Sequence, residues 1–448
     1  MLAARRCADR RARAAGCRAR SAIGRACIDG GRGLTRLPAG ASRRRSASRL
    51  PVRCSSLSLT NFRNYARLDL PLRDAVVVYG DNAQGKSNLL EAIRLLSTTK
   101  SLRSTADREM LHWGVQDSDT GFARVSGQCE RRSGPVRVEI VIGNGERLNA
   151  RDSTRAVVKR YKVNGVPRRA IDVIGQVTVV QFSPADLDLV LGPPSERRRF
   201  LDLAIAQVDG RHVRSLSRYG KVLQQRNSLL KQMREGGGRH EHLDVWSEEL
   251  VNTGAYIVAR RMEMVRRLTT LVRDAHGALT DCAETLDAEY RATIDGVEGA
   301  TVDAIGDVAD TFRRALTASR GRDIATGQTL VGPHRDDLRL TNAGHDLLPY
   351  GSRGQQRAGA LALKIAEGEY VREVTGEWPI LLLDDVLSEL DANRRRRVFA
   401  ASHEGQQVIV TTTDLTAIDR DFLDRSQVIE IRAGTVIARE PFGADGQA

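Results

Sequence analysis

Cysteine is scarce in this chain, and its placement argues against both disulfide and zinc chemistry. Six cysteines occur among 448 residues, and no two of them form a C-x-x-C pair. Close, regular spacing of cysteines is typical of disulfide frameworks and of structural zinc sites. The sequence therefore predicts neither and favours a reducing compartment. The cysteines in or beside the N-terminal leader are Cys7, Cys17, Cys27 and Cys54, and the two elsewhere are Cys129 and Cys282.

Long apolar runs are also missing. A membrane-spanning helix needs about 20 consecutive apolar residues, and no segment approaches that length. The chain is nevertheless long enough for two or three domains with a sizeable hydrophobic core. We therefore expect a protein located in the cytoplasm that has no membrane association.

Acidic residues are almost absent from the first 53 residues, which hold fifteen Arg, no Lys and only Asp9 and Asp29. This stretch carries +13 of the formal charge of +14, so the rest is nearly neutral and the high pI does not indicate DNA binding. It lacks the apolar h-region of a secretory signal, whereas an organelle transit peptide or a disordered basic tail fits its composition. We favour another interpretation, in which a start near Val52 makes residues 1–52 a leader outside the native fold.

The strongest positive signal is a glycine-rich loop between an apolar run and a segment with helical spacing of apolar residues. Residues 76–78 are three valines, residues 80–87 follow the pattern G-x-x-x-x-G-K-S, and 89–96 have the helical spacing. Strand, glycine loop and helix N-terminus together form a P-loop, whose backbone N–H groups and helix dipole bind phosphates. The chain is therefore predicted to bind ATP. The predicted nucleotide-binding residues of the loop are Gly80, Asp81, Asn82, Ala83, Gln84, Gly85, Lys86, Ser87 and Asn88.

Two residues of the loop and two aspartates have predicted roles in the chemistry. Lys86 would contact the β- and γ-phosphates, and the Ser87 hydroxyl would ligate Mg²⁺. Asp384 ends an apolar run over residues 379–383, where α/β folds place ligand residues, and fits a Walker B aspartate that holds Mg²⁺. Asp385 follows at once and is the predicted catalytic carboxylate, because it can turn toward an attacking water and deprotonate it.

A third polar stretch, Ser352 to Gln356, precedes a helix predicted to run to about residue 374. A serine at this position caps the helix and presents its hydroxyl and backbone N–H groups to an anion. Alone, the pattern is more typical of an ordinary N-cap without a ligand. Together with the P-loop, the Asp384–Asp385 pair and the Ser-Glu-Leu-Asp run at 388–391, it favours contact with the nucleotide.

Strand-like and helix-like segments alternate around the P-loop, which predicts the α/β class. Pro71 favours an edge position for a short strand over 68–72. From Ser195, predicted to be an N-cap, to about residue 290 the pattern is nearly all helical and is broken only by glycines 236–238. We therefore expect a helical subdomain inserted into an ATPase head. The predicted division is a leader at 1–52, the head at 53–192 and 311–448, and the helical subdomain at 193–310.

The order of seven sequence blocks makes a family resemblance specific. The blocks are residues 59–65, 80–88, 182–187, 195–202, 225–227, 332–337 and 381–391. They span about 55–440, and in this order the chain resembles the RecF family of bacterial recombination mediators. That family is part of the SMC-like branch of the ABC-type ATPases, so the resemblance implies a P-loop ABC-type ATPase head with an inserted helical lobe.

The resemblance also implies activity and partners. It implies ATP-dependent homodimerisation, DNA binding, and weak DNA-stimulated ATP hydrolysis that serves as a switch. Work with RecO and RecR in loading RecA at gapped DNA is implied as well. A run over 411–414 replaces the switch histidine of ABC transporters, which suggests slow hydrolysis.

Further site residues come from the same resemblance. Ser352 and Gly354, with Gln355 in the same stretch, are expected to contact the γ-phosphate held by the partner subunit, so Ser352 counts among the catalytic residues. Arg63 is expected near the base or phosphates of the nucleotide. Gln181 lies in the region of the Q-loop glutamine, and this assignment stays open.

Four basic clusters could contact DNA phosphates, and the sequence does not choose among them. The alternatives to a DNA-binding ATPase are an ABC transporter subunit and a P-loop nuclease or small-molecule kinase. The first lacks support because no Leu-Ser-Gly-Gly-Gln sequence is present, and the second because no additional acidic cluster or substrate lid is evident. The four clusters are residues 159–162, 168–169, 197–199 and 394–397.

Overall fold

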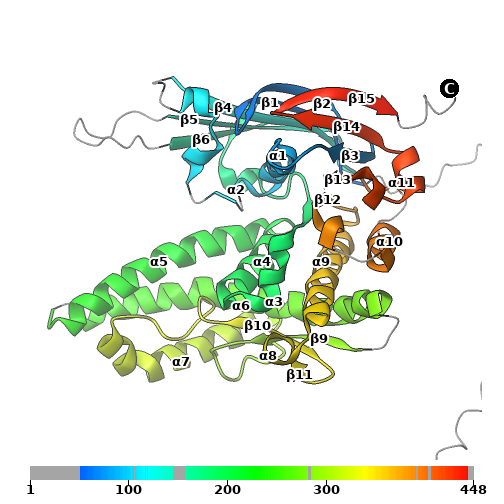
Figure 1. Cartoon of the computed structure of the whole chain (residues 1–448). Coiled ribbons are helices and arrows are strands. Elements are labelled where there is room, and N and C mark those ends of the chain that lie inside the picture. The colour runs from blue at the N-terminus through cyan, green and yellow to red at the C-terminus, as the bar shows by residue number, and fades with distance from the viewer. Residues whose placement is uncertain are drawn as a thin grey trace, which may run out of the picture. The chain divides into compact units, whose positions relative to one another are not determined.

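The computed structural model describes residues 51–441, apart from 102, 105, 117, 119, 145–156, 238, 281–283, 390–391 and 402–404. Residues 1–50 of the predicted leader therefore lie outside the described residues, and so do Leu390 and Asp391 of the Ser-Glu-Leu-Asp run. Val52, the last residue of the predicted leader, is described: it is buried in a hydrophobic core and its N–H donates to Trp378 O at 3.1 Å. All described residues belong to one compact unit, Arg49–Ala448. Its elements combine two six-stranded sheets, a three-stranded sheet and a group of long helices (Figure 1).

The P-loop strand lies inside a mostly parallel sheet with the order β15-β14-β3-β13-β12-β8. The strands β14, β3, β13, β12 and β8 run parallel to one another, and β15 pairs antiparallel at the edge. The carboxyl ends of these parallel strands therefore meet at one side of the sheet, which is where ligands bind in α/β folds. The strands are β3 (Ala75–Tyr79), β8 (Val179–Phe182), β12 (Ile380–Asp384), β13 (Val408–Thr412), β14 (Gln427–Arg432) and β15 (Thr435–Pro441).

Both faces of this sheet are buried, which explains why its strands are continuous apolar runs. Successive side chains of a strand point to opposite faces. Val77 accordingly joins one hydrophobic core with Leu381 and Leu383, whereas Ile380 and Leu382 join the other. The predicted α/β class is confirmed, and the run at 379–383 is the buried strand that its composition predicted.

A six-stranded antiparallel sheet and helix α1 (Lys86–Thr98) cover one face of the parallel sheet. Its order is β2-β1-β4-β5-β6-β7, so β2 with Pro71 lies at an edge, as predicted. Pairing of β1 with β4 places Cys54 opposite Cys129 as two buried free thiols, a proximity that their sequence separation did not indicate. The strands are β1 (Arg53–Phe62), β2 (Tyr65–Pro71), β4 (Phe122–Glu130), β5 (Val136–Asn144), β6 (Val157–Val163) and β7 (Val166–Arg168).

Helices cover the opposite face of the parallel sheet and continue into a separate hydrophobic cluster. Helix α9 (Arg353–Thr375) packs on β8 and on α6 (His240–Thr280), while α5 (Gly210–Arg234), α6 and α7 (Ile305–Thr326) pack together (Figure 1). The predicted boundary at residue 310 falls inside α7, and the division into domains stays a prediction. The small sheet consists of β9 (Leu286–Arg291), β10 (Asp337–Asn342) and β11 (His345–Asp346).

One predicted helix start is wrong. Helix α4 (Pro194–Ala206) begins before Ser195, and Pro193 is its N-cap residue. Proline suits the first helical position because the N–H it lacks would have no partner inside the helix. The remaining short elements are η1 (Asp107–Met110), η2 (Trp113–Val115), α2 (Ala170–Val173), η3 (Pro184–Leu187), α3 (Asp188–Leu191), η4 (Val302–Ala304), α8 (Leu347–Tyr350), η5 (Val386–Glu389), α10 (Ala392–Ala401), η6 (Leu415–Ala417) and α11 (Arg420–Asp424).

Among the residues that the structure describes, no helix combines the length and the apolar character that crossing a membrane requires.

Candidate nucleotide-binding site

The glycine-rich loop connects β3 to the first turn of α1, and both of its glycines are required by geometry. Gly80 and Gly85 have φ angles of 149° and 115°, which side chains disfavour. A Cβ on Gly80 would also overlap the carbonyl oxygen of Ile431, and one on Gly85 would overlap the side-chain amide of Asn64. The loop is therefore closed tightly by its neighbours, with α1 starting at Lys86.

Lys86 lies inside the loop rather than reaching into solvent. Its Nζ donates hydrogen bonds to the carbonyl oxygens of Gly80 at 2.6 Å and Asp81 at 2.8 Å. Burial lowers the pKa of Lys86, while the nearby carboxylates of Asp385 and Asp384 oppose that shift. The ammonium group is thus partly desolvated and lies close to the two aspartates predicted to act at the phosphates.

Two turns from other parts of the chain hold the loop in place. The side-chain amide of Asn64, in the β1–β2 turn, donates to Gln84 O at 2.8 Å and its Oδ1 accepts from Asn88 at 2.9 Å. The Tyr65 hydroxyl donates to Gly85 O at 2.9 Å. From the β14–β15 turn, the backbone N–H of Gly434 donates to Gln84 O at 2.9 Å. Sequence reasoning assigned no site role to Asn64 or Tyr65, although both lie in one of the blocks that carry the family resemblance.

The predicted metal ligands Ser87 and Asp384 are in direct contact. The Ser87 hydroxyl donates to Asp384 Oδ1 at 2.7 Å, and Thr411 at the end of the neighbouring strand β13 donates to the same oxygen at 3.0 Å. Asp384 is only 7% exposed. One hydroxyl and one carboxylate at the carboxyl edge of the sheet are oxygen ligands of the kind that Mg²⁺ takes beside nucleotide phosphates. These residues therefore fit the ion, and Thr411 is a positioning residue that the sequence did not single out for this role.

Asp385 has a backbone that turns away from the strand. Its φ of 53° lies in the left-handed region, and its N–H donates to the Thr411 hydroxyl at 3.0 Å. Left-handed backbone is uncommon for residues other than glycine, and it is retained where the surroundings hold it. The side chains of Asp384 and Asp385 nevertheless line the same cavity as Ser87.

That cavity has a volume of ≈ 580 Å³ and extends from the metal ligands to the helices α4 and α9. Gln181, at the end of β8, lines it together with Ser87, Asp384 and Asp385. Charged side chains also line this cavity, among them Arg94, Asp186 and Lys364. Burial raises the pKa of Asp186 although Lys364 and Arg94 oppose the rise, and burial lowers the pKa of Arg94 although Glu367 and Asp186 oppose it.

The expected residue Arg63 lies close to the loop but is bound to protein groups. Its guanidinium makes a two-point ion pair with Glu91 of α1, at 2.7 and 2.8 Å, and donates to Glu109 O at 2.8 Å. Glu91 itself lines the cavity beside Ser87. The expected contact between Arg63 and the nucleotide stays a prediction. Glu91 connects Arg63 to the cavity, because it pairs with Arg63 and also lines the cavity.

Ser352 caps α9, and the predicted cap geometry is present. Its hydroxyl accepts from the Gln355 N–H at 3.3 Å, and the Gln355 side chain accepts from the Ser352 N–H at 2.8 Å. Ser352 is exposed, as expected for a residue that would act in another subunit. The lining of the ≈ 580 Å³ cavity, within the described part of the chain, does not include Ser352, Gly354 or Gln355.

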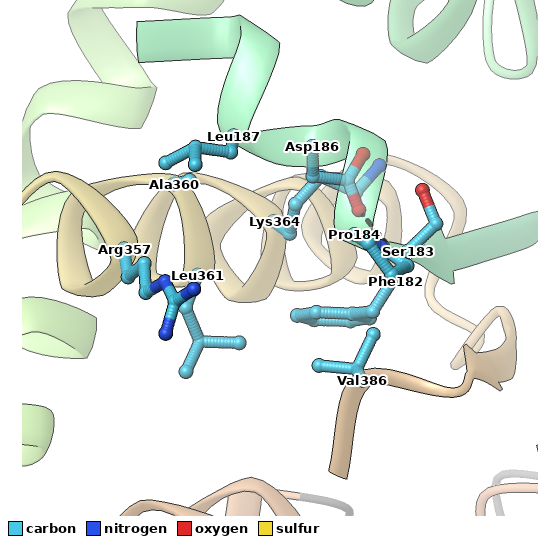
Figure 2. Close-up of a pocket in the computed structure, with 10 residues that line it drawn as sticks. All are labelled: Phe182, Ser183, Pro184, Asp186, Leu187, Arg357, Ala360, Leu361, Lys364 and Val386. Atoms are coloured by element: carbon cyan, nitrogen blue, oxygen red, sulfur yellow. Dashed lines mark hydrogen bonds between the residues drawn. The ribbon is translucent and has the colours of Figure 1, made fainter. Parts of the chain in front are cut away.

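Helix α9 connects this exposed cap to the carboxyl edge of the parallel sheet. Figure 2 shows a small pocket of ≈ 50 Å³ between α9 and the segments that follow β8 and β12. The Phe182 ring lies beside Val386, and Arg357 and Lys364 of α9 line the same pocket. Lys364 also lines the larger cavity, so one helix carries both Ser352 and a wall of the predicted active site.

Several charged motif residues turn inward instead of forming a binding surface. Arg197 is 7% exposed and makes a two-point contact with Asp337 at 2.7 and 2.9 Å. Arg261 pairs with Asp202 at 2.7 and 2.8 Å. Arg226, which is 0% exposed, pairs with the equally buried Asp323 at 2.9 Å.

The four predicted DNA-binding clusters differ in how their cations are used. In the cluster at 159–162, Lys159 pairs with Asp107 at 2.6 Å and the exposed Lys162 pairs with Glu139 at 3.3 Å, while Arg160 is exposed. Arg168 and Arg169 are exposed. In the cluster at 197–199, all three arginines contact protein groups, and in that at 394–397 Arg397 donates to Ala278 O.

Known proteins resemble this chain over nearly all of the described residues. Residues 53–431 match the family model described as "RecF/RecN/SMC N terminal domain". The "DNA replication and repair protein RecF" of Chloroflexus aurantiacus is 45% identical over 395 residues, which are 85% of this chain and 98% of that protein. The protein of the same description from Bacillus velezensis is 36% identical over 385 residues, 85% of this chain and 99% of that protein.

Solved structures agree with these relatives. The "Structure of the recombination mediator protein RecF-ATP in RecFOR pathway" superposes with a TM-score of 0.76 at 32% identity, covering 88% of this chain and 99% of that one. A second structure, described as RecF-ATPrS, gives the same TM-score and identity over 87% of this chain and 98% of that one. On its fold, the arrangement of its P-loop and these relatives, the chain belongs to the RecF family of the RecF/RecN/SMC group.

Proposed function

We propose that this chain is an ATP-dependent DNA-binding protein of replication and recombinational repair. The single observation that supports it most is the junction of Ser87 with Asp384, at 2.7 Å, between the P-loop and the strand β12. The relatives named for DNA replication and repair, and the RecF structures described with ATP, support the choice of nucleotide and process.

The residues of this chain would divide the chemistry as follows. Lys86 would hold the β- and γ-phosphates, and Ser87 and Asp384 would hold Mg²⁺, with Thr411 orienting the Asp384 carboxylate. The bound ion would neutralise charge that develops on the phosphates. Asp385 would accept a proton from the attacking water, and Gln181, which lines the same cavity, would help to position that water.

A shared active site follows from the placement of Ser352. In the proposed dimer, the exposed cap of α9 would face the P-loop of the partner subunit and contact the γ-phosphate with Ser352 and the backbone at Gly354. ATP would then join two subunits around DNA, and slow, DNA-stimulated hydrolysis would release them. Cooperation with RecO and RecR in loading RecA at gapped DNA is the biological role that we propose for this cycle.

Mixing two inactive variants tests the shared site. We take Lys86→Ala and Ser352→Arg, each expected to be inactive alone. In a mixed dimer, the intact P-loop of one subunit faces the intact Ser352 of the other. Random pairing makes about half of the dimers mixed, so roughly a quarter of wild-type ATPase sites should return when the equimolar mixture is assayed with gapped DNA.

The control replaces Lys86→Ala with the double variant Lys86→Ala/Ser352→Arg. Its mixture with Ser352→Arg contains no complete site and should stay inactive. Exchange of subunits is measured separately with fluorescently labelled chains. Mixed dimers without any recovered activity would show that the active site does not use Ser352 of the partner.

A further inference from the structure

Helix α5 has an unusual charge distribution. It carries Arg or Lys throughout its 25 residues and contains no Asp or Glu. Not all of these cations are available, because Arg226 is buried in its ion pair with Asp323 and Arg211 lies over the Tyr256 ring. The other cations of the helix are Arg214, Arg218, Lys221, Lys231 and Arg234.

Three of these cations share one face, and that face borders a groove. Arg214, Arg218 and Lys221 are spaced by four and three residues, which places them on the same side of a helix. All three are exposed and line a groove of ≈ 400 Å³, together with Ser217 and Gln225 of the same helix. The opposite helical face of α5 packs on α6 and α7.

Further positive charge lies at the start of α2, the helix that lines the groove through Ile171. Arg169 is the N-cap residue of α2. Arg168, at the end of β7, lies opposite Tyr161 of β6. Residues that lie opposite each other share one face of the sheet, so the Arg168 side chain is on the same face as the Tyr161 ring, which packs against a hydrophobic core. Arg168 and Arg169 are both exposed.

Neighbouring carboxylates reduce this charge but do not cancel it. Arg218 pairs with Glu249 at 2.5 Å, and Arg169 pairs with Asp172 at 3.1 Å. Both pairs are at the surface, where solvent screens them and the cation exchanges readily to another anion. Three cations line the groove, and one of them, Arg218, is paired with a carboxylate.

We propose that this groove binds the phosphate backbone of DNA through Arg214, Arg218 and Lys221 of α5, with Arg168 and Arg169 at the start of α2 as further cations beside the groove. Arg214 and Lys221 are about 10 Å apart along the helix. The same length of duplex carries about three phosphates on each strand, so the cations match the spacing of a polyanion. The three cations would contact phosphates and not base edges, so the inferred binding is independent of sequence.

This inference rests on the proposed function, since it names the surface by which the chain would hold DNA. It combines one predicted cluster, Arg168 and Arg169, with cations of α5 that the sequence did not indicate. The four predicted DNA-binding clusters each consist of cations that are adjacent or nearly adjacent in sequence. The cations of α5 are spread over eight positions and become neighbours only when the helix forms and α2 packs beside it.

The test compares the salt dependence of DNA binding by the full-length chain and by two variants. The groove variant is Arg214→Gln/Lys221→Gln, and the matched control is Lys231→Gln/Arg234→Gln, on the same helix but outside the groove lining. Affinity for a short duplex and for its single strand is measured by fluorescence anisotropy in the presence of ATP, over a series of salt concentrations. The leader is identical in all three proteins, so its charge does not affect the difference.

Removing two phosphate contacts should reduce the slope of log K against log salt by about 1.8 on duplex DNA or about 1.4 on single-stranded DNA. The DNA form whose loss reaches its own expected value is the form that occupies the groove. Thermal unfolding and ATP binding of the groove variant should match those of the unchanged chain, since both side chains are exposed.

Three results would overturn the inference. Equal slopes for the groove variant and the unchanged chain would place DNA elsewhere while leaving the proposed function intact. Equal losses in the groove variant and the control would show a general effect of charge. Loss of affinity for polyglutamate but not for DNA would assign the groove to an acidic protein. If the unchanged chain bound no DNA at low salt, the proposed function itself would fail.

Discussion

Two regions of this protein contain the same kinds of charged residues and use them differently. At the carboxyl edge of the parallel sheet, Lys86, Asp384 and Asp385 line or adjoin a cavity of ≈ 580 Å³. In the helical region, Arg226 and Asp323 are both 0% exposed and bind each other. The first arrangement places charged groups at a cavity of ≈ 580 Å³. In the second, the two charges bind each other and join two helices, although Arg226 also borders a smaller cavity of ≈ 200 Å³.

The helical region forms a continuous polar network around the segment 332–337. Tyr290 donates to Asp336 at 2.6 Å, and Arg261 donates to the carbonyl oxygen of Pro333 at 2.7 Å. The backbone N–H of Thr293 donates to the other oxygen of Asp336 at 2.7 Å. The motif at 332–337, which is rich in Arg, His and Asp, can therefore be required by packing alone. The charged residues predicted to act on the nucleotide differ from it in lining or adjoining the ≈ 580 Å³ cavity.

The largest expected effects concern the sheet edge and should leave folding intact. Asp385→Asn should lower ATP turnover by about 10²–10⁴-fold, because it removes the proposed proton acceptor while keeping the shape of the side chain. Nucleotide binding and the ATP-dependent dimer should persist.

Lys86→Ala should instead abolish nucleotide binding, because it removes the cation from the phosphates. Fluorescent-nucleotide titration and an ATPase assay separate the two outcomes.

Thermal unfolding is the control for both variants. The unfolding midpoint of each should shift less than that of a variant that breaks the buried pair of Arg226 and Asp323. An Asp385→Asn protein that hydrolyses ATP at the normal rate would contradict the catalytic assignment. Loss of nucleotide binding in that variant would also do so, because the residue would then act as a ligand.

The next effect concerns the buried pair in the helical region. Arg226→Met should lower the free energy of unfolding by about 3–5 kcal/mol, because it leaves the Asp323 carboxylate buried without its cation. Chemical unfolding followed by circular dichroism measures the loss. The double variant Arg226→Met/Asp323→Asn should recover much of it, since the amide oxygen can still accept from Leu330 N and carries no charge.

ATP binding by Arg226→Met, measured well below its unfolding midpoint, should be close to that of the unchanged chain. A large loss of nucleotide affinity with little loss of stability would reverse the comparison and give the helical network a direct role in nucleotide binding.

The smallest expected effect is a dependence of stability on pH that arises from His334. Its Nε2 faces the carbonyl oxygen of Thr329 at 3.0 Å and its Nδ1 faces the Tyr219 hydroxyl at 2.7 Å, which together favour the neutral ring with the proton on Nε2. Burial lowers the pKa of His334 to about 4. The unfolded chain takes up this proton near pH 6.5 and the folded chain only near pH 4, so stability is complete above pH 6.5 and falls as the pH decreases toward 4.

The full loss below pH 4 would be about 3 kcal/mol. His334→Gln keeps one donor and one acceptor but does not titrate, so the difference in unfolding free energy between it and the unchanged chain should vary between pH 6.5 and 4 and be constant above. A difference that is independent of pH over this range would contradict the assignment.

Local sequence patterns determined the nucleotide-binding half of this protein to a large extent. The P-loop, the strand at 380–384 and the cap at Ser352 each depend on residues within about ten positions, where hydrophobic periodicity, glycine conformation and hydrogen bonding to the adjacent backbone act directly. The α/β class followed from the same short-range signals. The start of α4 was misplaced, because Pro194 suits the first helical position better than the pattern at Ser195 indicated. The helical pattern predicted to about residue 290 also extended too far, since α6 ends at Thr280 and the strand β9 begins at Leu286.

Tertiary structure alone decided which distant residues meet and which charges remain exposed. Asn64 supports the P-loop through Gln84, and Thr411 orients Asp384, across separations that no periodicity records. Arg197 turns inward only because β10 brings Asp337 to it, whereas the cations of α5 face a groove that exists only once α2 packs nearby. The physical reason is that burial and pairing depend on every element packed around a side chain, and those elements come from all parts of the chain.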